Sequence, residues 1–132
     1  MNADAKRVQN IIERYLSMWN ESDPDRRHEI VKGLWADDGE NVSRRFDIRG
    51  VDEIVRRVDQ AHTDWVQSKG FIFKAAGAAD SHNHLILLPW EMAPRKGGMP
   101  EARGTDVFVL NGDGRIQSLY HFAALAQTAA TT

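Results

Sequence analysis

The chain has 132 residues, 42% hydrophobic and 27% charged, as in an ordinary globular protein, and this length predicts one domain spanning residues 1–132. A net charge of −2 gives no reason to expect nucleic acid or an anionic membrane as partner, and the lack of cysteine excludes disulfides and thiol chemistry. No stretch approaches the ~20 apolar residues of a membrane span, and the start of the chain has no signal-like apolar run, so we expect a cytoplasmic protein.

Three amphipathic helices are predicted in the first half of the chain, because apolar residues recur there every three or four positions. Asp23 suits the N-cap of the second helix, whose buried face extends to Trp35, and Gly70 suits the end of the third. Between the second and third helices the chain is predicted to be irregular or briefly extended. The predicted helices are residues 5–19, a segment from Pro24 to the sequence ADDG at 36–39, and residues 51–69.

Four strands are predicted after Gly70, which gives an α+β order of three helices followed by a mostly antiparallel sheet. The sequence NGDG between the last two strands is typical of a tight hairpin turn. A two-residue turn at Gly112 and Asp113 would place Asp106 opposite Leu119. The predicted strands are residues 71–77, 84–93, 103–110 and 115–125, and the tail 125–132 is expected to be frayed.

Both faces of the last hairpin are apolar, so each is expected to be shielded from water by another part of the protein or by a partner. Alternation along the strands defines an inner face with Asp106, Phe108, Leu110, Gln117, Leu119 and His121. It defines an outer face with Val107, Val109, Ile116, Tyr120 and Phe122. Because the helices can cover only one face, we expect the convex outer face to form a homodimer.

The sequence resembles the nuclear transport factor 2-like superfamily, in particular its SnoaL-like and ketosteroid isomerase-like branch. The resemblance covers nearly the whole chain and rests on the segments IIERYLSMWNESDP, LWADDG, RGVDEI and GTDVFVLNGDGRIQSLYHF. It implies a cone-shaped, cystatin-like α+β fold, in which a curved sheet wraps the helices and leaves a pocket at its open end. The superfamily contains isomerases, cyclases, hydrolases, dehydratases and non-catalytic binding modules, so the resemblance leaves the reaction open.

Three candidate catalytic residues follow from this resemblance. Tyr15 and Asp106 match the tyrosine and the aspartic acid that form the oxyanion hole of ketosteroid isomerases. The position of the catalytic base in that family holds Ser43, which cannot act as a carboxylate base. His121 stands where SnoaL-like cyclases and limonene epoxide hydrolases have an aspartate on the last strand, and a histidine can transfer protons near neutral pH.

Further residues are expected to line the pocket, although large aromatic side chains also simply fill protein cores. This set consists of Trp19, Trp35, Ser43, His62, Trp65, Trp90, Met92, Phe108 and Leu119. Asp80, His82 and His84 alternate as ligands of a metal could, but such alternation is also typical of a solvated strand edge, and we expect no metal. The charged runs RRVDQ and DPDRRHE are interpreted as solvated helix faces and not as anion sites.

The leading functional hypothesis is a cofactor-independent acid–base enzyme of the isomerase, cyclase or dehydratase type. Its partner would be a small hydrophobic organic molecule, with Asp106 and His121 moving protons and Tyr15 stabilising negative charge. Two alternatives remain open at this point: a pocket that binds a small molecule without chemistry, and a dimeric interaction module of the same fold.

Overall fold

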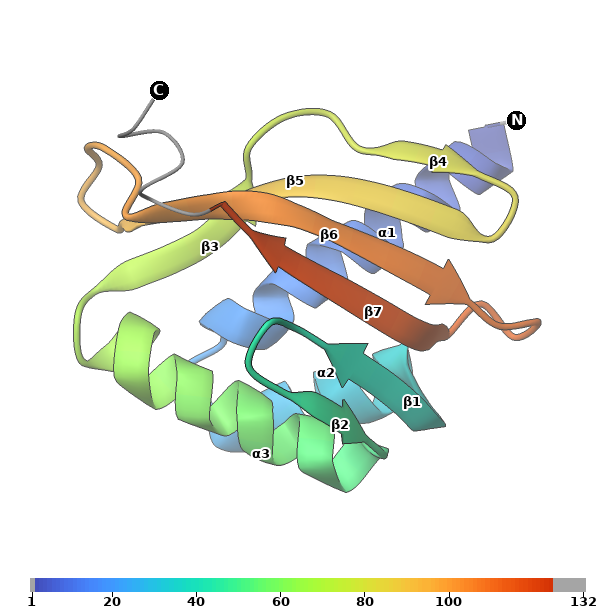
Figure 1. Cartoon of the computed structure of the whole chain (residues 1–132), viewed down its shortest axis with the longest axis horizontal. Helices are drawn as coiled ribbons and strands as arrows, with labels where there is room; N and C mark the ends of the chain where they lie inside the picture. The colour runs from blue at the N-terminus through green and yellow to red at the C-terminus, as the bar shows by residue number, and fades with distance from the viewer. Residues whose placement is uncertain (1, 125–132) are drawn as a thin grey trace.

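The computed structural model describes residues 2–124, and the tail predicted to be frayed lies outside them. The helices lie on one face of a curved sheet, with α1 running across it and α3 crossing near β1 and β2 (Figure 1). Within residues 2–124, no helix is both long and apolar enough to span a membrane. The helices are α1 (Asn2–Asn20), α2 (Pro24–Leu34), α3 (Val51–Ala61) and the π-helix η1 (His62–Gln67), which continues α3.

The sheet has seven strands in the order β2-β1-β7-β6-β5-β3, and β4 pairs with β5 beside this path. Every pairing is antiparallel except that of β1 with β7, which is parallel. Helices packed on a curved, mostly antiparallel sheet confirm the expected α+β cone. The strands are β1 (Trp35–Val42), β2 (Asp47–Arg49), β3 (Phe71–Ala75), β4 (Asp80–His82), β5 (Leu85–Pro94), β6 (Ala102–Leu110) and β7 (Ile116–Ala123).

The second helix begins as predicted but ends earlier. Asp23 caps it by accepting a hydrogen bond from the backbone N–H of Asp25 at 3.0 Å, and Pro24 occupies the first turn. The helix ends at Leu34, and Trp35 begins β1, where it pairs with Ile116 of β7. The prediction that Trp35 belongs to a helix is therefore wrong, because a pairing partner about eighty residues away leaves no local signal in the sequence.

The last hairpin has a longer loop than the sequence predicted. The side-chain oxygen of Asn111 accepts hydrogen bonds from the backbone N–H groups of Asp113 (2.9 Å) and Arg115 (3.0 Å), which closes a wider turn. A bulge follows at the start of β7, so that Asp106 pairs with His121 and not with Leu119.

The bulge also changes which face Ile116 occupies. Its side chain is fully buried in the core, whereas the alternation had placed it on the outer face. Beyond the bulge, the pairing of β6 with β7 is shifted by two residues from the expected register. Because side chains alternate between faces with a period of two, this shift leaves each residue on its expected face. Asp106, Leu119 and His121 therefore still share the inner face.

A polar cluster joins α2 to α3 on the far side of the core. The Arg27 side chain is almost completely buried and donates to Asp59 Oδ1 at 2.9 Å and to the Glu21 carbonyl oxygen at 2.7 Å. His28 Nε2 lies 2.9 Å from Asp59 Oδ2. Arg27 is thus a structural group, and interpreting DPDRRHE as a wholly solvated face is wrong at this residue.

Replacing Asp59 with Asn should lower the free energy of unfolding by about 1–2 kcal/mol at neutral pH, because Arg27 keeps its burial and loses an ionic partner. Partial burial raises the pKa of Asp59, but hydrogen bonds and charges from His28 and Arg27 outweigh it and hold the pKa below its ordinary value. The stabilisation is therefore present above the unfolded-state pKa and lost as pH falls through the folded-state pKa. Urea unfolding at a series of pH values should show the difference between variant and wild type shrinking at acidic pH; a constant difference would contradict this assignment.

Candidate functional site

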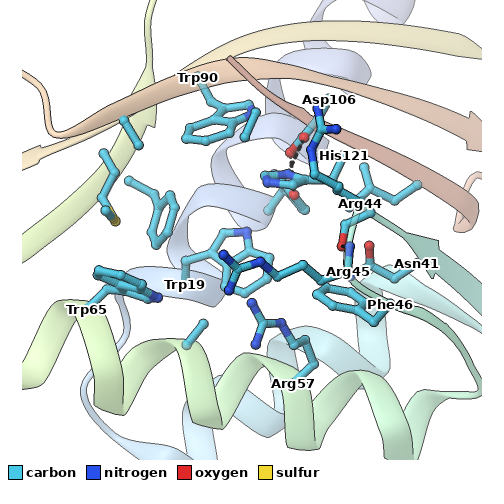
Figure 2. A pocket seen from close by; sticks show the side chains of 18 of the residues that line it. Trp19, Asn41, Arg44, Arg45, Phe46, Arg57, Trp65, Trp90, Asp106 and His121 are labelled. Atoms are coloured by element: carbon cyan, nitrogen blue, oxygen red, sulfur yellow. Dashed lines mark hydrogen bonds and ion pairs between the residues drawn. The ribbon is translucent and has the colours of Figure 1, made fainter. Parts of the chain in front are cut away.

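A cavity of about 490 Å³ opens between the inner face of the sheet and the helices α1 and α3 (Figure 2). Three aromatic rings pack against one another in sequence along its wall. Trp19 packs on Phe73 with ring centres 5.5 Å apart, and Phe73 packs on Trp90 at 6.1 Å. Apolar side chains lining the cavity include Trp19, Trp65, Phe73, Trp90, Met92 and Leu119.

Three polar side chains form a hydrogen-bonded chain along one wall of this cavity. The Tyr15 hydroxyl donates to Asp106 Oδ2 at 2.6 Å, and His121 Nδ1 lies 2.7 Å from Asp106 Oδ1. Tyr15 comes from α1, while Asp106 and His121 are directly paired residues of β6 and β7. Tyr15 and Asp106 are buried, whereas the His121 side chain is 29% exposed. His121 is therefore the member of the chain that a ligand can reach.

The hydrogen bonds indicate which group carries each proton. Burial raises the pKa of Tyr15 well above its usual value, and the negative charge of Asp106 acts in the same direction, so the phenol stays protonated and donates. The second oxygen of Asp106 is in position to accept from Nδ1–H of His121, and in that tautomer Nε2 is the ring's acceptor. The hydroxyl proton of Tyr15 is thus directed at Asp106 and not at a ligand.

The His121 ring is also fixed from its face. The Trp90 indole stacks on it with ring centres 4.9 Å apart and an angle of 17° between the planes. Gly104, which pairs with Trp90 across the strands, makes room for this indole, since a Cβ there would overlap the Phe122 carbonyl oxygen and the Trp90 ring. Packing on one side and a carboxylate at Nδ1 leave the imidazole little freedom to turn.

Three arginines that were not predicted from the sequence also line the cavity. Arg44 and Arg45 come from the β1–β2 connection and are exposed at its mouth, while Arg57 projects from α3 and is half-buried. Figure 2 shows the Arg45 and Arg57 side chains reaching toward the cavity in front of Trp19. None of the three arginines forms an ion pair within residues 2–124.

Arg57 is held in an unfavourable electrostatic environment. Burial lowers the pKa of Arg57, the positive charge of Arg45 acts in the same direction, and Asp64 opposes them. The Arg57 guanidinium lies 4.5 Å from the centre of the Phe46 ring. Interpreting RRVDQ as a solvated face is therefore wrong at Arg57, although a helical spacing of four aligns this residue with Ala61 and Trp65, which also line the cavity.

Six of the nine expected lining residues lie at the cavity, and three do not. Those at the cavity are Trp19, Ser43, Trp65, Trp90, Met92 and Leu119. Trp35 is fully buried at the start of β1, where its Nε1 donates to the sulfur of Met18 at 3.3 Å. His62 is buried behind the cavity, with Nδ1 2.9 Å from the Trp19 carbonyl oxygen, and Phe108 packs edge-on against Tyr15 at 4.7 Å in the core.

The alternating Asp80, His82 and His84 do not share a strand face, because β4 ends at His82 and His84 lies in the following turn. Within residues 2–124, no group of three or more histidine, aspartate or glutamate side chains could hold a metal ion.

The sequence matches no family model and no curated protein at a significant level. Among solved structures, the chain is similar to a SnoaL-like family protein from Agrobacterium tumefaciens proposed to be an isomerase, with a TM-score of 0.81 and 29% identity, covering 91% of this chain and 99% of that one. It is also similar to a nuclear transport factor 2-like protein of unknown function from Exiguobacterium (TM-score 0.65, 20% identity, 86% and 98% covered). A protein from Sinorhizobium meliloti proposed to be a polyketide cyclase gives a TM-score of 0.64 at 20% identity, with 85% and 93% covered.

The chain belongs to the nuclear transport factor 2-like superfamily. This confirms the expected superfamily. The 29% identical protein from Agrobacterium is SnoaL-like, whereas the two proteins at 20% identity support the fold alone. In this SnoaL-like chain, the two residues at the oxyanion-hole positions, Tyr15 and Asp106, bind each other. Ser43 lies at the cavity, and its hydroxyl accepts a hydrogen bond from the backbone N–H of Arg45 at 3.3 Å.

Proposed function

We propose that this SnoaL-like chain is a cofactor-independent acid–base enzyme in which Nε2 of His121 removes a proton from a carbon next to a carbonyl group. The observation that carries the proposal is the chain from Tyr15 through Asp106 to His121, which ends on a ring nitrogen at an apolar cavity. Asp106 fixes the tautomer and orientation of the ring, and it stabilises the imidazolium that forms, as the carboxylate does in Asp–His pairs generally. Tyr15 is a positioning residue that holds Asp106.

The proposed reaction requires no oxidant, reductant or second substrate. The electrons of the broken C–H bond form an enolate, and the proton moves to Nε2 of His121. The imidazolium then returns that proton to the same carbon in exchange, to another carbon in isomerisation, or to a departing hydroxide in dehydration. In cyclisation the enolate carbon attacks a second carbonyl group of the substrate, and the proton goes to the alkoxide oxygen that forms. In each case the neutral ring is restored. Isomerisation, aldol-type cyclisation and dehydration can all begin with this step, so the proposal specifies the proton transfer and leaves the class of product open.

The surroundings of His121 favour such an enolate. Aromatic side chains form much of the cavity wall, and electrostatic interactions are stronger beside such apolar surfaces than in bulk water. The arginines that line the cavity, which form no ion pair among residues 2–124, contribute a positive potential toward developing negative charge. Ser43 supplies no base, so His121 carries the role that a carboxylate performs in ketosteroid isomerases.

The proton-transfer step can be tested without knowing the natural product. Wild-type protein in deuterium oxide should accelerate deuterium incorporation into β-tetralone or phenylpyruvate, a neutral and an anionic carbonyl compound with acidic C–H bonds, above the rate in buffer alone. Proton NMR measures the loss of the C–H signal. Exchange equal to the buffer rate for both compounds, in a protein that binds either of them, would favour the alternative of a non-catalytic binding pocket, which the serine at position 43 also fits.

We further propose that the outer face of the sheet forms a homodimer. Leu87 and Phe122 on this face are 44% and 61% exposed, and partly buried Val107, Val109 and Tyr120 lie between them on adjacent strands. Phe122→Asp should therefore shift the protein from dimer to monomer in sedimentation experiments. Met99→Asp is the matched control, because Met99 is also an exposed apolar residue (83%) but lies in the loop between β5 and β6. A wild-type monomer would contradict the proposal.

A further inference from the structure

The cavity carries more unsatisfied hydrogen-bonding groups than a site for a purely hydrophobic molecule needs. Three buried side-chain polar atoms have no hydrogen-bond partner among the described residues, and all three belong to residues that line the cavity. They are Asn41 Oδ1, Arg57 Nε and Trp90 Nε1. Buried polar groups are nearly always hydrogen-bonded in folded proteins, so each of these atoms calls for a partner. Figure 2 shows the three residues on different walls, and Arg57, whose Nε is a donor, is the one that lies beside Arg45.

The charges around the cavity specify the sign of such a partner. Arg45 and Arg57 approach it from two different elements, and neither has a carboxylate partner among the described residues. The acidic side chains that line the same cavity are Asp106, which Tyr15 and His121 already bind, and Glu101, which is exposed at the rim. Two facing guanidinium groups repel each other, and an anion between them would remove that repulsion and satisfy the donors.

We propose that the substrate is an aromatic or alicyclic carbonyl compound that also carries a carboxylate, with this carboxylate bound by Arg45 and Arg57 at the cavity mouth and the apolar body against Trp19, Trp65 and Phe73. This inference deepens the proposed function, since it names the substrate class of the same cavity. It also orients the substrate: the carboxylate stays near solvent, and the ring portion extends inward past Trp19 toward the wall that carries His121. The expected small hydrophobic molecule thus becomes an amphipathic one, whose charged end is fixed by planar guanidinium donors.

Binding of an unreactive probe tests this inference independently of catalysis. Isothermal titration calorimetry should show that wild-type protein binds naphthoate about tenfold or more tightly than naphthamide, a neutral molecule of nearly the same shape. Arg57→Met and Arg45→Met should each remove most of this preference and leave naphthamide binding unchanged. Arg26→Met is the matched control, because Arg26 is an exposed arginine of α2 whose only ion pair among the described residues is a 4.0 Å contact with Asp23.

Thermal unfolding of each variant verifies that it is folded before its affinity is compared, and the Arg45 variant alone suffices if the half-buried Arg57 proves essential for folding. Equal binding of naphthoate and naphthamide, no binding of either, or equal losses in the Arg26 control would each overturn the proposal. The two proposals fail separately. Preference for naphthoate without deuterium exchange would support the anion site and contradict the proposed enzymatic activity. Exchange of neutral β-tetralone without that preference would support the enzymatic activity and contradict the anion site.

Discussion

The His121→Ala variant should lose about 10²–10⁴-fold of the deuterium-exchange activity, expressed as kcat/KM, while its fold stays unchanged. His121 contributes the accessible ring nitrogen of the hydrogen-bonded chain, and Ser43 cannot replace it as a base. The side chain is partly exposed and packs on Trp90 from one face, so its removal should leave the core intact. Proton NMR of β-tetralone in deuterium oxide measures the rate.

Two further measurements separate a chemical role of His121 from a structural one. Added imidazole should restore part of the exchange in the alanine variant, because the ring can bind in the space beside Trp90 that the substitution opens. His84→Ala is the matched control, since His84 is an exposed histidine in the turn before β5. Exchange at the wild-type rate in His121→Ala would exclude this residue as the base.

The Asp106→Asn variant should retain the shape of the site and still lose most of its activity. An asparagine can donate its amide N–H to Nδ1 of His121, which would move the ring proton to Nε2 and leave no acceptor at the cavity. The same change in a Ser–His–Asp triad costs about 10⁴-fold in kcat. Here we expect the rate of deuterium exchange to fall by about 10²–10⁴-fold, as in the His121→Ala variant.

Nitrogen-15 NMR of the histidine rings reports the mechanism of this effect directly. Wild-type protein should show the Nδ1–H tautomer at His121, and Asp106→Asn should show the Nε2–H tautomer. Tyr15→Phe removes the other hydrogen bond to Asp106 and should lower the free energy of unfolding by about 1 kcal/mol, with a much smaller effect on exchange. An unchanged tautomer in Asp106→Asn, or equal activity losses in both variants, would contradict the orienting role of Asp106.

The sequence alone predicted the elements whose signals are local. Periodic apolar residues located the three helices, and Asp23 with Pro24 located the start of the second. The NGDG sequence located the last hairpin. The hairpin loop is wider than expected because the side chain of Asn111 bonds two backbone groups across it, and that choice between turn types depends on contacts the local sequence does not specify.

The candidate site divides in the same way. Asp106 and His121 could be placed on one face because strand alternation survives a shift of two residues. Sequence reasoning gave Tyr15 the task of stabilising negative charge in the substrate, whereas the structure directs its hydroxyl at Asp106. Trp35 was expected at the cavity because of its size, and Phe108 because of strand alternation. Both are fully buried in the core instead, since burial depends on which elements cover a residue.

What the sequence by itself determined is therefore the order of the elements, the superfamily resemblance and the pair of residues on the last hairpin. Only the tertiary structure decided that β1 pairs in parallel with β7, that Tyr15 of α1 meets Asp106, and that arginines from the β1–β2 connection and from α3 surround one cavity. The physical reason is that periodicity and capping act over a few residues. Hydrogen bonds and charge pairs that build a site join side chains tens of residues apart, and these depend on how a curved sheet closes over its helices.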